Sequence, residues 1–267
     1  NGASLANIHL TQPFGNGMSL GPLSSGLNLN LRLGVDPVTD SFVGLSGSDV
    51  MLSGADMVGA KIAVNLNNTQ YIWLEISEFD NQIPSWSDSG ATVTAYKATY
   101  FHQGVTQQLC PSTSPENQWF TLIPDERYNA GTNEVESAPG TVTIACVGEA
   151  AAKMKLMGYA PQTEFDGSGA PSTVAQRQAT LKMITADYCG TGTSYTQTGT
   201  PVVWRNQAGS VDSSNWHVPG AVEAVWDEHG ARCLGATRIT GTQVGCVLPS
   251  CAGYSLDDGE WQTQVAP

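Results

Sequence analysis

The chain has 267 residues, of which 40% are hydrophobic and only 13% are charged, and its formal net charge is −13. That length allows one large domain or two modest ones. The acidic balance argues against nucleic acid and anionic membrane surfaces as partners, and no apolar stretch approaches the roughly 20 residues of a membrane-spanning helix. A surface built mostly from uncharged polar residues is common on exported proteins. Because the chain begins at Asn1 without Met, we also expect that a leader peptide was removed by processing or lies outside this sequence.

A five-residue pattern, in which Asn or Ser followed by Gly precedes an apolar residue, recurs near the start of the chain. Its copies cover residues 1–5, 16–20, 25–29, 46–50 and 53–57. Contiguous units of this kind can wind into a β-solenoid, but these copies are separated by unequal gaps. We therefore expect an irregular or β-rich arm over residues 1–58 and one domain over residues 59–267.

From about residue 60 the hydrophobic pattern is that of β-strands. Apolar residues alternate over 62–66 and again over 72–76, and Asn67-Asn68 between them predicts a hairpin. Further strands are expected at 91–100, 119–123, 141–146, 201–205, 221–226 and 231–234. The last two flank residues 227–230, which are typical of a hairpin loop with Gly230 at positive φ.

Two segments in the middle of the chain have the spacing of helices. The first, over residues 147–159, places Ala150, Met154 and Met157 on one face. The second, over residues 173–188, ends close to Gly190, a residue well suited to stop a helix. A glycine-containing loop joins them, so we expect the two helices to lie antiparallel. The predicted fold class is α+β, a β-rich, disulfide-stabilised domain with one antiparallel helical hairpin.

The six cysteines predict a disulfide framework. They are Cys110, Cys146, Cys189, Cys233, Cys246 and Cys251. Their number is even and no CxxC pair occurs, so zinc-ribbon and thioredoxin-like spacings are absent. Three disulfides formed in an oxidising compartment are the favoured interpretation, and six buried free thiols are the alternative.

Only one disulfide pair can be argued from the sequence. An antiparallel helical pair sets the start of the first helix beside the end of the second, which predicts a bond between Cys146 and Cys189. The other two pairs then lie among the remaining four cysteines, and we favour Cys233 with Cys246 because the loop between them is short.

Three separated motifs resemble those of the ADYC domain, a bacterial family named for a tetrapeptide. Here the tetrapeptide is Ala186, Asp187, Tyr188 and Cys189, followed by Gly190 in a glycine-rich turn. The sequence IACVGEAAAKMKLMGY at 144–159 and AVWDEHGARC at 224–233 complete the resemblance, which covers about residues 53–255. It implies an exported or lipoprotein-like bacterial chain, often preceded by Asn-Gly-x-x-Leu repeats, and carries no established activity.

This sequence also departs from the family pattern that it resembles. Members commonly have one extra cysteine in each helix, near Met154 and Thr180 here, and both are absent together, as expected for a bridge across a helical pair. Members often have Asp and His where this chain has Thr191 and Tyr195. Because these two family residues are replaced here, the resemblance gives less support to acid–base or metal chemistry in that turn.

Candidates for catalysis are few. None of the four histidines stands in a close metal-ligand pattern, and Glu228-His229 is the best acid–base candidate, with a solvated turn as the favoured interpretation. Asp187 and Tyr188 invite a catalytic interpretation too. We favour a structural one, in which Asp187 accepts hydrogen bonds from backbone N–H groups after Cys189 and Tyr188 packs in the core.

Binding candidates are acidic loops and aromatic rings. The loops at Asp166, Asp212 and Asp257-Asp258 offer oxygen ligands for calcium but match no EF-hand, so no cofactor is predicted. Three tryptophans, Trp86, Trp216 and Trp261, lie in polar segments and can stack on carbohydrate or dock on a partner. The alternative is that these rings cover the edges of the sheet.

The sequence therefore predicts a non-catalytic bacterial protein located in the periplasm, on the outer surface or outside the cell. It would act by binding another envelope component or by self-assembly, for example through a strand that the arm adds to a neighbouring copy. The alternative is a secreted hydrolase that uses scattered carboxylates such as Asp187, Asp227 and Glu228.

Overall fold

Antiparallel strands dominate the computed structural model, which describes residues 8–11, 31–67, 70–87, 90–102, 104–162, 170–197, 199–212 and 221–265. The strands are β1 (Ile8–Thr11), β2 (Arg32–Asp36), β3 (Ser41–Ser46), β4 (Asp49–Ser53), β5 (Lys61–Asn67), β6 (Gln70–Pro84), β7 (Thr92–His102), β8 (Val105–Gln108), β9 (Phe120–Asn129), β10 (Glu134–Cys146), β11 (Val202–Asn206), β12 (Val222–Asp227), β13 (Gly230–Leu234) and β14 (Trp261–Val265). The α-helices are α1 (Ala150–Leu156) and α2 (Val174–Thr185), and they contact each other. The β-rich α+β class with a helical pair is confirmed.

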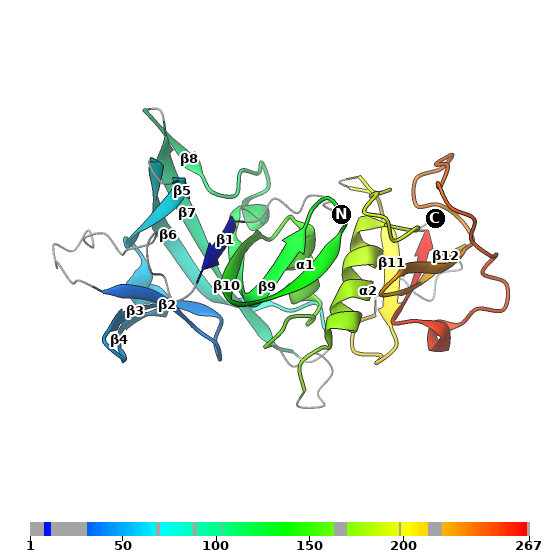
Figure 1. The fold of residues 1–267 in the computed structure, drawn as a ribbon, viewed down its shortest axis with the longest axis horizontal. Helices are drawn as coiled ribbons and strands as arrows, with labels where there is room; N and C mark the ends of the chain where they lie inside the picture. The colour runs from blue at the N-terminus through cyan, green and yellow to red at the C-terminus, as the bar shows by residue number, and fades with distance from the viewer. Residues whose placement is uncertain are drawn as a thin grey trace.

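The strands form three antiparallel sheets. The largest has the order β1-β10-β9-β7-β6-β5, with β8 paired to β7. A four-stranded sheet has the order β11-β14-β12-β13, and β2-β3-β4 form a third. Figure 1 shows α2 between the large sheet and the four-stranded sheet, and α2 contacts both β10 and β12. The predicted hairpin of β5 and β6 is confirmed, with Ile62 opposite Leu74.

Two apolar cores follow from this arrangement. One lies against the large sheet and contains Phe42, Ile62, Leu74 and Tyr96. The Phe42 N–H donates to Tyr96 Oη (2.9 Å), and burial raises the pKa of Tyr96 to about 12. The other core joins α1, α2 and the four-stranded sheet, and it includes Trp226.

Part of the predicted arm packs on the domain. Leu33 of β2 and Phe42 of β3 belong to the same core as Ile62, and β1 pairs with β10. The first three copies of the five-residue pattern lie outside the described residues. In the two described copies both glycines have positive φ, Gly47 in the turn after β3 and Gly54 at the start of a 3-10 helix. The division at residue 58 and self-assembly through the arm stay predictions.

Helix α2 begins as the sequence predicts and ends earlier. Thr173 and Gln176 form a capping box at its start. It ends at Thr185 because Ala186 adopts a left-handed conformation (φ 53°). The N–H of Asp187 then donates to Lys182 O, which is the bond of a Schellman motif. The prediction that Gly190 stops this helix is wrong, since the chain has already turned four residues before it.

A framework of three disulfides is confirmed, and it uses all six cysteines. The bonds join Cys110 to Cys146, Cys189 to Cys246, and Cys233 to Cys251. The predicted pair Cys146–Cys189 is wrong because Cys146 does not open the first helix. It ends β10 opposite Phe120 of β9, and α1 begins only at Ala150.

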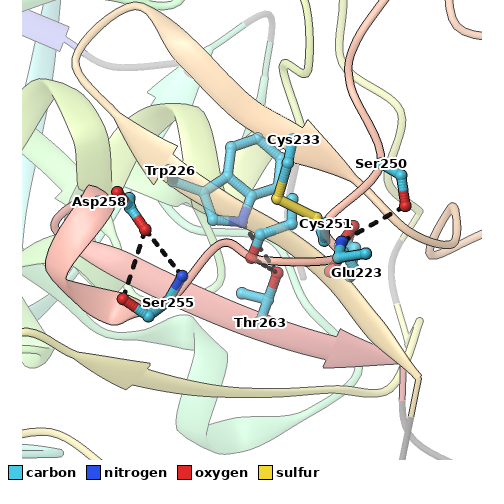
Figure 2. Close-up of a disulfide and its surroundings, with 10 residues drawn as sticks. Glu223, Trp226, Cys233, Ser250, Cys251, Ser255, Asp258 and Thr263 are labelled. Atoms are coloured by element: carbon cyan, nitrogen blue, oxygen red, sulfur yellow. Dashed lines mark hydrogen bonds between the residues drawn. A yellow bond between two sulfur atoms is a disulfide. The ribbon is translucent and has the colours of Figure 1, made fainter.

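The predicted pair Cys233–Cys246 is also wrong. After β13 the chain folds back so that the Leu234 N–H donates to Pro249 O (2.9 Å), and this return sets Cys251 beside Cys233. Figure 2 shows the resulting disulfide, which joins Cys233 of β13 to Cys251.

Cys246 lies instead beside the turn that follows Cys189. The neighbouring Gly245 N–H donates to Tyr195 Oη (3.3 Å) in that turn. The Cys189–Cys246 bond therefore ties the turn after α2 to the C-terminal segment.

Candidate functional site

The Ala-Asp-Tyr-Cys tetrapeptide lies in the turn after α2, and its carboxylate is fully engaged. Asp187 Oδ1 accepts from Thr191 N (3.0 Å), and Oδ2 accepts from Gly192 N (2.8 Å). Lys182 Nζ donates to the same Oδ2 (2.8 Å), and both side chains are buried. These backbone bonds are the arrangement that the sequence predicts, and they fold the glycine-rich turn around the carboxylate.

Lys182 is satisfied at every donor. Besides Asp187, its ammonium group donates to Thr132 O (2.9 Å) and to Gly190 O (3.2 Å). A lysine has three donors, so this set completes its hydrogen bonding in the core. The ammonium thus joins the β9–β10 connection to the turn after α2.

Tyr188 belongs to the core, as predicted. Its ring stacks on Trp226 with centroids 5.2 Å apart, and its hydroxyl donates to Glu223 Oε1 (2.6 Å). Burial raises the pKa of Tyr188, and the nearby Glu223 carboxylate raises it further. The phenol is therefore a structural donor at neutral pH.

Sequence analysis missed the ion pair that completes this cluster. Arg238 donates to both carboxylate oxygens of Glu223 (2.9 and 3.1 Å), and both side chains are almost completely buried. The same guanidinium donates to Met183 O and Ile184 O, two carbonyls of the last turn of α2. A signal was present, since Glu223 is the charged residue inside the otherwise apolar stretch 222–226 of β12.

Close backbone contact joins the tetrapeptide to the β12–β13 hairpin. A Cβ atom placed on Gly190, which has φ +69°, would lie 1.9 Å from His229 O. Gly230 has positive φ, as predicted, and a Cβ there would lie 2.9 Å from Tyr188 O. The turn after α2 and the β12–β13 hairpin can therefore approach this closely only because both positions lack a Cβ atom.

Glu228 and His229, the best acid–base candidates, lie at the tip of this hairpin. The His229 side chain is 83% exposed, and its Nε2 lies 3.6 Å from Glu228 Oε1. The His229 N–H donates to Asp227 Oδ1 (2.8 Å). The pair is a solvated turn, which was the favoured interpretation.

The carboxylates of the hydrolase alternative do not gather at one place. Asp227 and Glu228 line a surface hollow of about 320 Å³ together with Asp257 and Asp258. Asp187 has no exposed surface and is held beneath its own turn. Substrate in the hollow therefore cannot contact it in this conformation.

The acidic loops proposed for calcium lie in different situations. The Asp258 carboxylate accepts from Ser255 N (2.8 Å), as Figure 2 shows, whereas Asp212 forms a backbone β-bridge with Arg205. Asp166 lies outside the described residues. Within the ranges that the structure describes, no group of three or more His, Cys, Asp or Glu side chains is placed to hold a metal ion.

The three candidate tryptophans differ from one another. Trp86 is 41% exposed and stacks on Trp204 with centroids 6.2 Å apart. The expectation of a loop-like, accessible Trp261 is wrong, because this residue opens β14, is fully buried and donates from Nε1 to Thr180 Oγ1 (2.8 Å). Trp216 lies outside the described residues.

Two further buried ion pairs anchor the helices. Lys155 of α1 donates to Asp40 Oδ2 (2.8 Å) and to Leu122 O (2.6 Å) at the base of a polar hollow of about 570 Å³. Arg177 of α2 donates from Nε to Glu126 Oε2 (2.7 Å). These buried charges are thus paired, and they fix the two helices on strands.

Burial of Glu126 should make the free energy of unfolding fall as the pH rises. Burial raises the pKa of Glu126 above its ordinary value of about 4.5, and Arg177 opposes part of that effect. The folded protein therefore keeps a proton that the unfolded chain has lost, so this contribution is present below about pH 4.5 and is lost as the pH rises through the raised pKa.

We expect the stability advantage of wild type over Glu126→Gln to shrink as the pH rises across that window. The loss is about 1.4 kcal/mol for each pH unit that the window spans. Urea unfolding of both proteins between pH 4 and 7 measures it, with the exposed Glu116→Gln as a control that should show no such loss. An advantage that grows with pH would mean that Arg177 outweighs burial.

An exposed groove on the large sheet was missed by sequence analysis. We call it the outer groove, a hollow of about 420 Å³ lined by Lys61, Trp73, Glu75, Thr99, Tyr100, Phe101 and Thr106. Its large rings, Trp73 and Phe101, are 44% and 61% exposed. The signal was in the alternation of β6, where Leu74 and Ile76 face the core and Trp73 therefore faces outward.

Comparisons with known proteins gave one match. A family model described as the ADYC domain matches residues 54–240, which include the tetrapeptide, the outer groove and Arg238. No curated protein and no solved structure gives a significant match. Among the described helices, none is both long enough and apolar enough to cross a membrane.

Proposed function

This chain belongs to the ADYC domain family, and we propose that it is an exported bacterial protein that works by binding rather than by catalysis. Its place would be the cell envelope or the extracellular space. The tetrapeptide that defines the family would serve to hold the fold together, and the binding surface would be the outer groove.

The observation that supports this proposal most strongly is that the ionisable side chains of the tetrapeptide are buried and hydrogen-bonded within the protein. Both carboxylate oxygens of Asp187 accept hydrogen bonds, from two backbone N–H groups and from Lys182, and the residue has no exposed surface. The Tyr188 hydroxyl donates to Glu223. A catalytic group must reach its substrate, and side chains fixed in this way support a structural role.

Export is supported by the disulfides and the surface. Three disulfides use every cysteine of the chain, and such bonds persist in oxidising compartments. Only 13% of the residues are charged, and the formal net charge is −13. Both features suit a protein that works outside the cytoplasm.

The hydrolase alternative rests on one observation, the hollow lined by Asp227, Glu228, Asp257 and Asp258. Carboxylates that converge on a hollow can act as a general acid and base. Glu228, Asp257 and Asp258 are exposed and Asp227 is half-buried at the surface hairpin, so isosteric replacement of Asp227 or Glu228 leaves the core in place and makes the alternative testable.

One experiment separates the two functions. Purified protein is mixed with an isolated bacterial envelope fraction, and the bound fraction and the release of soluble reducing ends and peptides are both measured. We expect saturable binding, weakened in Trp73→Ala and Phe101→Ala, with no release above buffer.

Either of two results would overturn the proposal. The first is the absence of saturable binding by wild type. The second is release of fragments that stops in Asp227→Asn or Glu228→Gln, which would establish the hydrolase. Val247→Ser, at a fully exposed site near Cys246 and away from both hollows, serves as the matched surface control.

A further inference from the structure

We propose that the outer groove binds a neutral saccharide, with Trp73 and Phe101 as the rings on which sugar units stack. This inference rests on the proposed binding function and names the class of ligand.

The strand register gathers the groove side chains on one face. Glu75 of β6 lies opposite Lys61 of β5 on one side and Thr99 of β7 on the other. The next outward-facing row contains Trp73 and Phe101, and Phe101 lies opposite Thr106 of β8. The groove thus draws on four neighbouring strands, which are hydrogen-bonded to one another.

The exposed rings are not needed by the core. Leu74, Ile76 and Ala98 of the same strands are buried beneath the sheet, while Trp73 and Phe101 leave about half or more of their surface in water. Single exposed apolar residues are common, but two large rings that line one hollow are a feature of binding sites. A volume of about 420 Å³ lies within the roughly 300–1,000 Å³ of small-molecule sites.

The mixture of groups matches the two kinds of surface on a sugar ring. The C–H face of a pyranose packs on aromatic rings, here Trp73 and Phe101. The hydroxyl rim needs donors and acceptors, which the Lys61 ammonium, the Glu75 carboxylate and the Thr99 hydroxyl supply at the edge of the groove.

The charges favour a neutral saccharide over an anionic one. Lys61 and Glu75 form an exposed ion pair (3.6 Å), so the groove carries no net charge from this pair. The chain as a whole has a formal net charge of −13, which repels uronate or phosphate polymers.

The test uses a panel of soluble hexasaccharides, namely cellohexaose, chitohexaose, xylohexaose and mannohexaose, with polygalacturonate as the anionic member. Tryptophan fluorescence and calorimetry report binding. We expect at least one neutral member to bind, polygalacturonate not to bind, and Trp73→Ala and Phe101→Ala each to weaken binding at least tenfold.

Trp86→Ala is the matched control, because Trp86 has nearly the same exposure as Trp73 but stacks on Trp204 outside the groove. It should bind like wild type. Thermal unfolding should show a cooperative transition for all three variants, with a modest and similar loss of stability for Trp73→Ala and Trp86→Ala because the two rings are buried to nearly the same extent. Binding that Trp86→Ala weakens, and that the groove variants leave intact, would place the site elsewhere and overturn the proposal.

The remaining outcomes distinguish the saccharide from other occupants. If no neutral hexasaccharide binds at millimolar concentration, while envelope binding still depends on Trp73 and Phe101, the ligand class is wrong and the binding function stands. If envelope binding is absent too, the proposed function fails with it. A dimer seen by sedimentation and abolished by Trp73→Ala would make the groove a contact between copies, which also overturns the saccharide.

Discussion

Arg238→Met should lower the free energy of unfolding by about 3–5 kcal/mol, the usual effect of removing one partner from a buried ion pair. The substitution leaves the Glu223 carboxylate charged and without its bidentate partner in the core. It also removes the hydrogen bonds that the guanidinium donates to Met183 O and Ile184 O at the end of α2, although the Ala186 N–H still donates to Met183 O. Denaturant unfolding under non-reducing conditions measures the loss.

The double variant Glu223→Gln with Arg238→Met should recover much of that loss. The introduced glutamine is uncharged and keeps an acceptor for the Tyr188 hydroxyl, so no buried charge is left unpaired. The control is Arg232→Met, because Arg232 pairs with Asp227 (3.3 Å) at the surface and should cost less than about 1 kcal/mol. Equal losses for Arg238→Met and Arg232→Met would contradict the structural role of the pair.

Gly190→Ala should cost more than about 4 kcal/mol, which is exceptional for one methyl group. The added Cβ would lie 1.9 Å from His229 O, and this oxygen belongs to the backbone of a hairpin that cannot turn aside like a side chain. Relief of the clash would require the hairpin to leave the turn after α2. The oxidised variant should therefore unfold at a much lower denaturant concentration than wild type.

Gly209→Ala is the control that separates the cost of the clash with His229 from the cost of placing an alanine at positive φ. Gly209 has φ +70°, nearly the same as Gly190 at +69°, but a Cβ there meets no atom within 4 Å. This control should show only the cost of a left-handed alanine, about 1–2 kcal/mol. If the two variants unfold together, or if Gly190→Ala is as stable as wild type, the contact with His229 is not a fixed part of the fold. Failure of Gly190→Ala alone to yield folded protein agrees with the prediction.

These two predictions concern one structural unit. The tetrapeptide turn contacts the β12–β13 hairpin through Gly190, binds Arg238 through Tyr188, and reaches the C-terminal segment through the Cys189–Cys246 bond. A change in this turn therefore disturbs three parts of the chain at once. We infer that the tetrapeptide is the junction on which the second core is assembled.

Features that depend on neighbouring residues could be predicted from the sequence. Alternation predicted β5 and β6, and helical spacing predicted α2, because both patterns arise within a few residues of chain. The engagement of Asp187 was also predictable, since its backbone partners at Thr191 and Gly192 are only four and five residues away.

Contacts between residues far apart in the chain became known only from the folded structure. Arg238 contacts carbonyls more than 50 residues earlier, and Cys189 bonds a cysteine 57 residues later. No local pattern encodes such pairs, because the strand order that brings them together depends on the packing of all three sheets. The outer groove has the same origin: alternation placed Trp73 and Phe101 outward on their strands, but only the β6–β7 register made them neighbours.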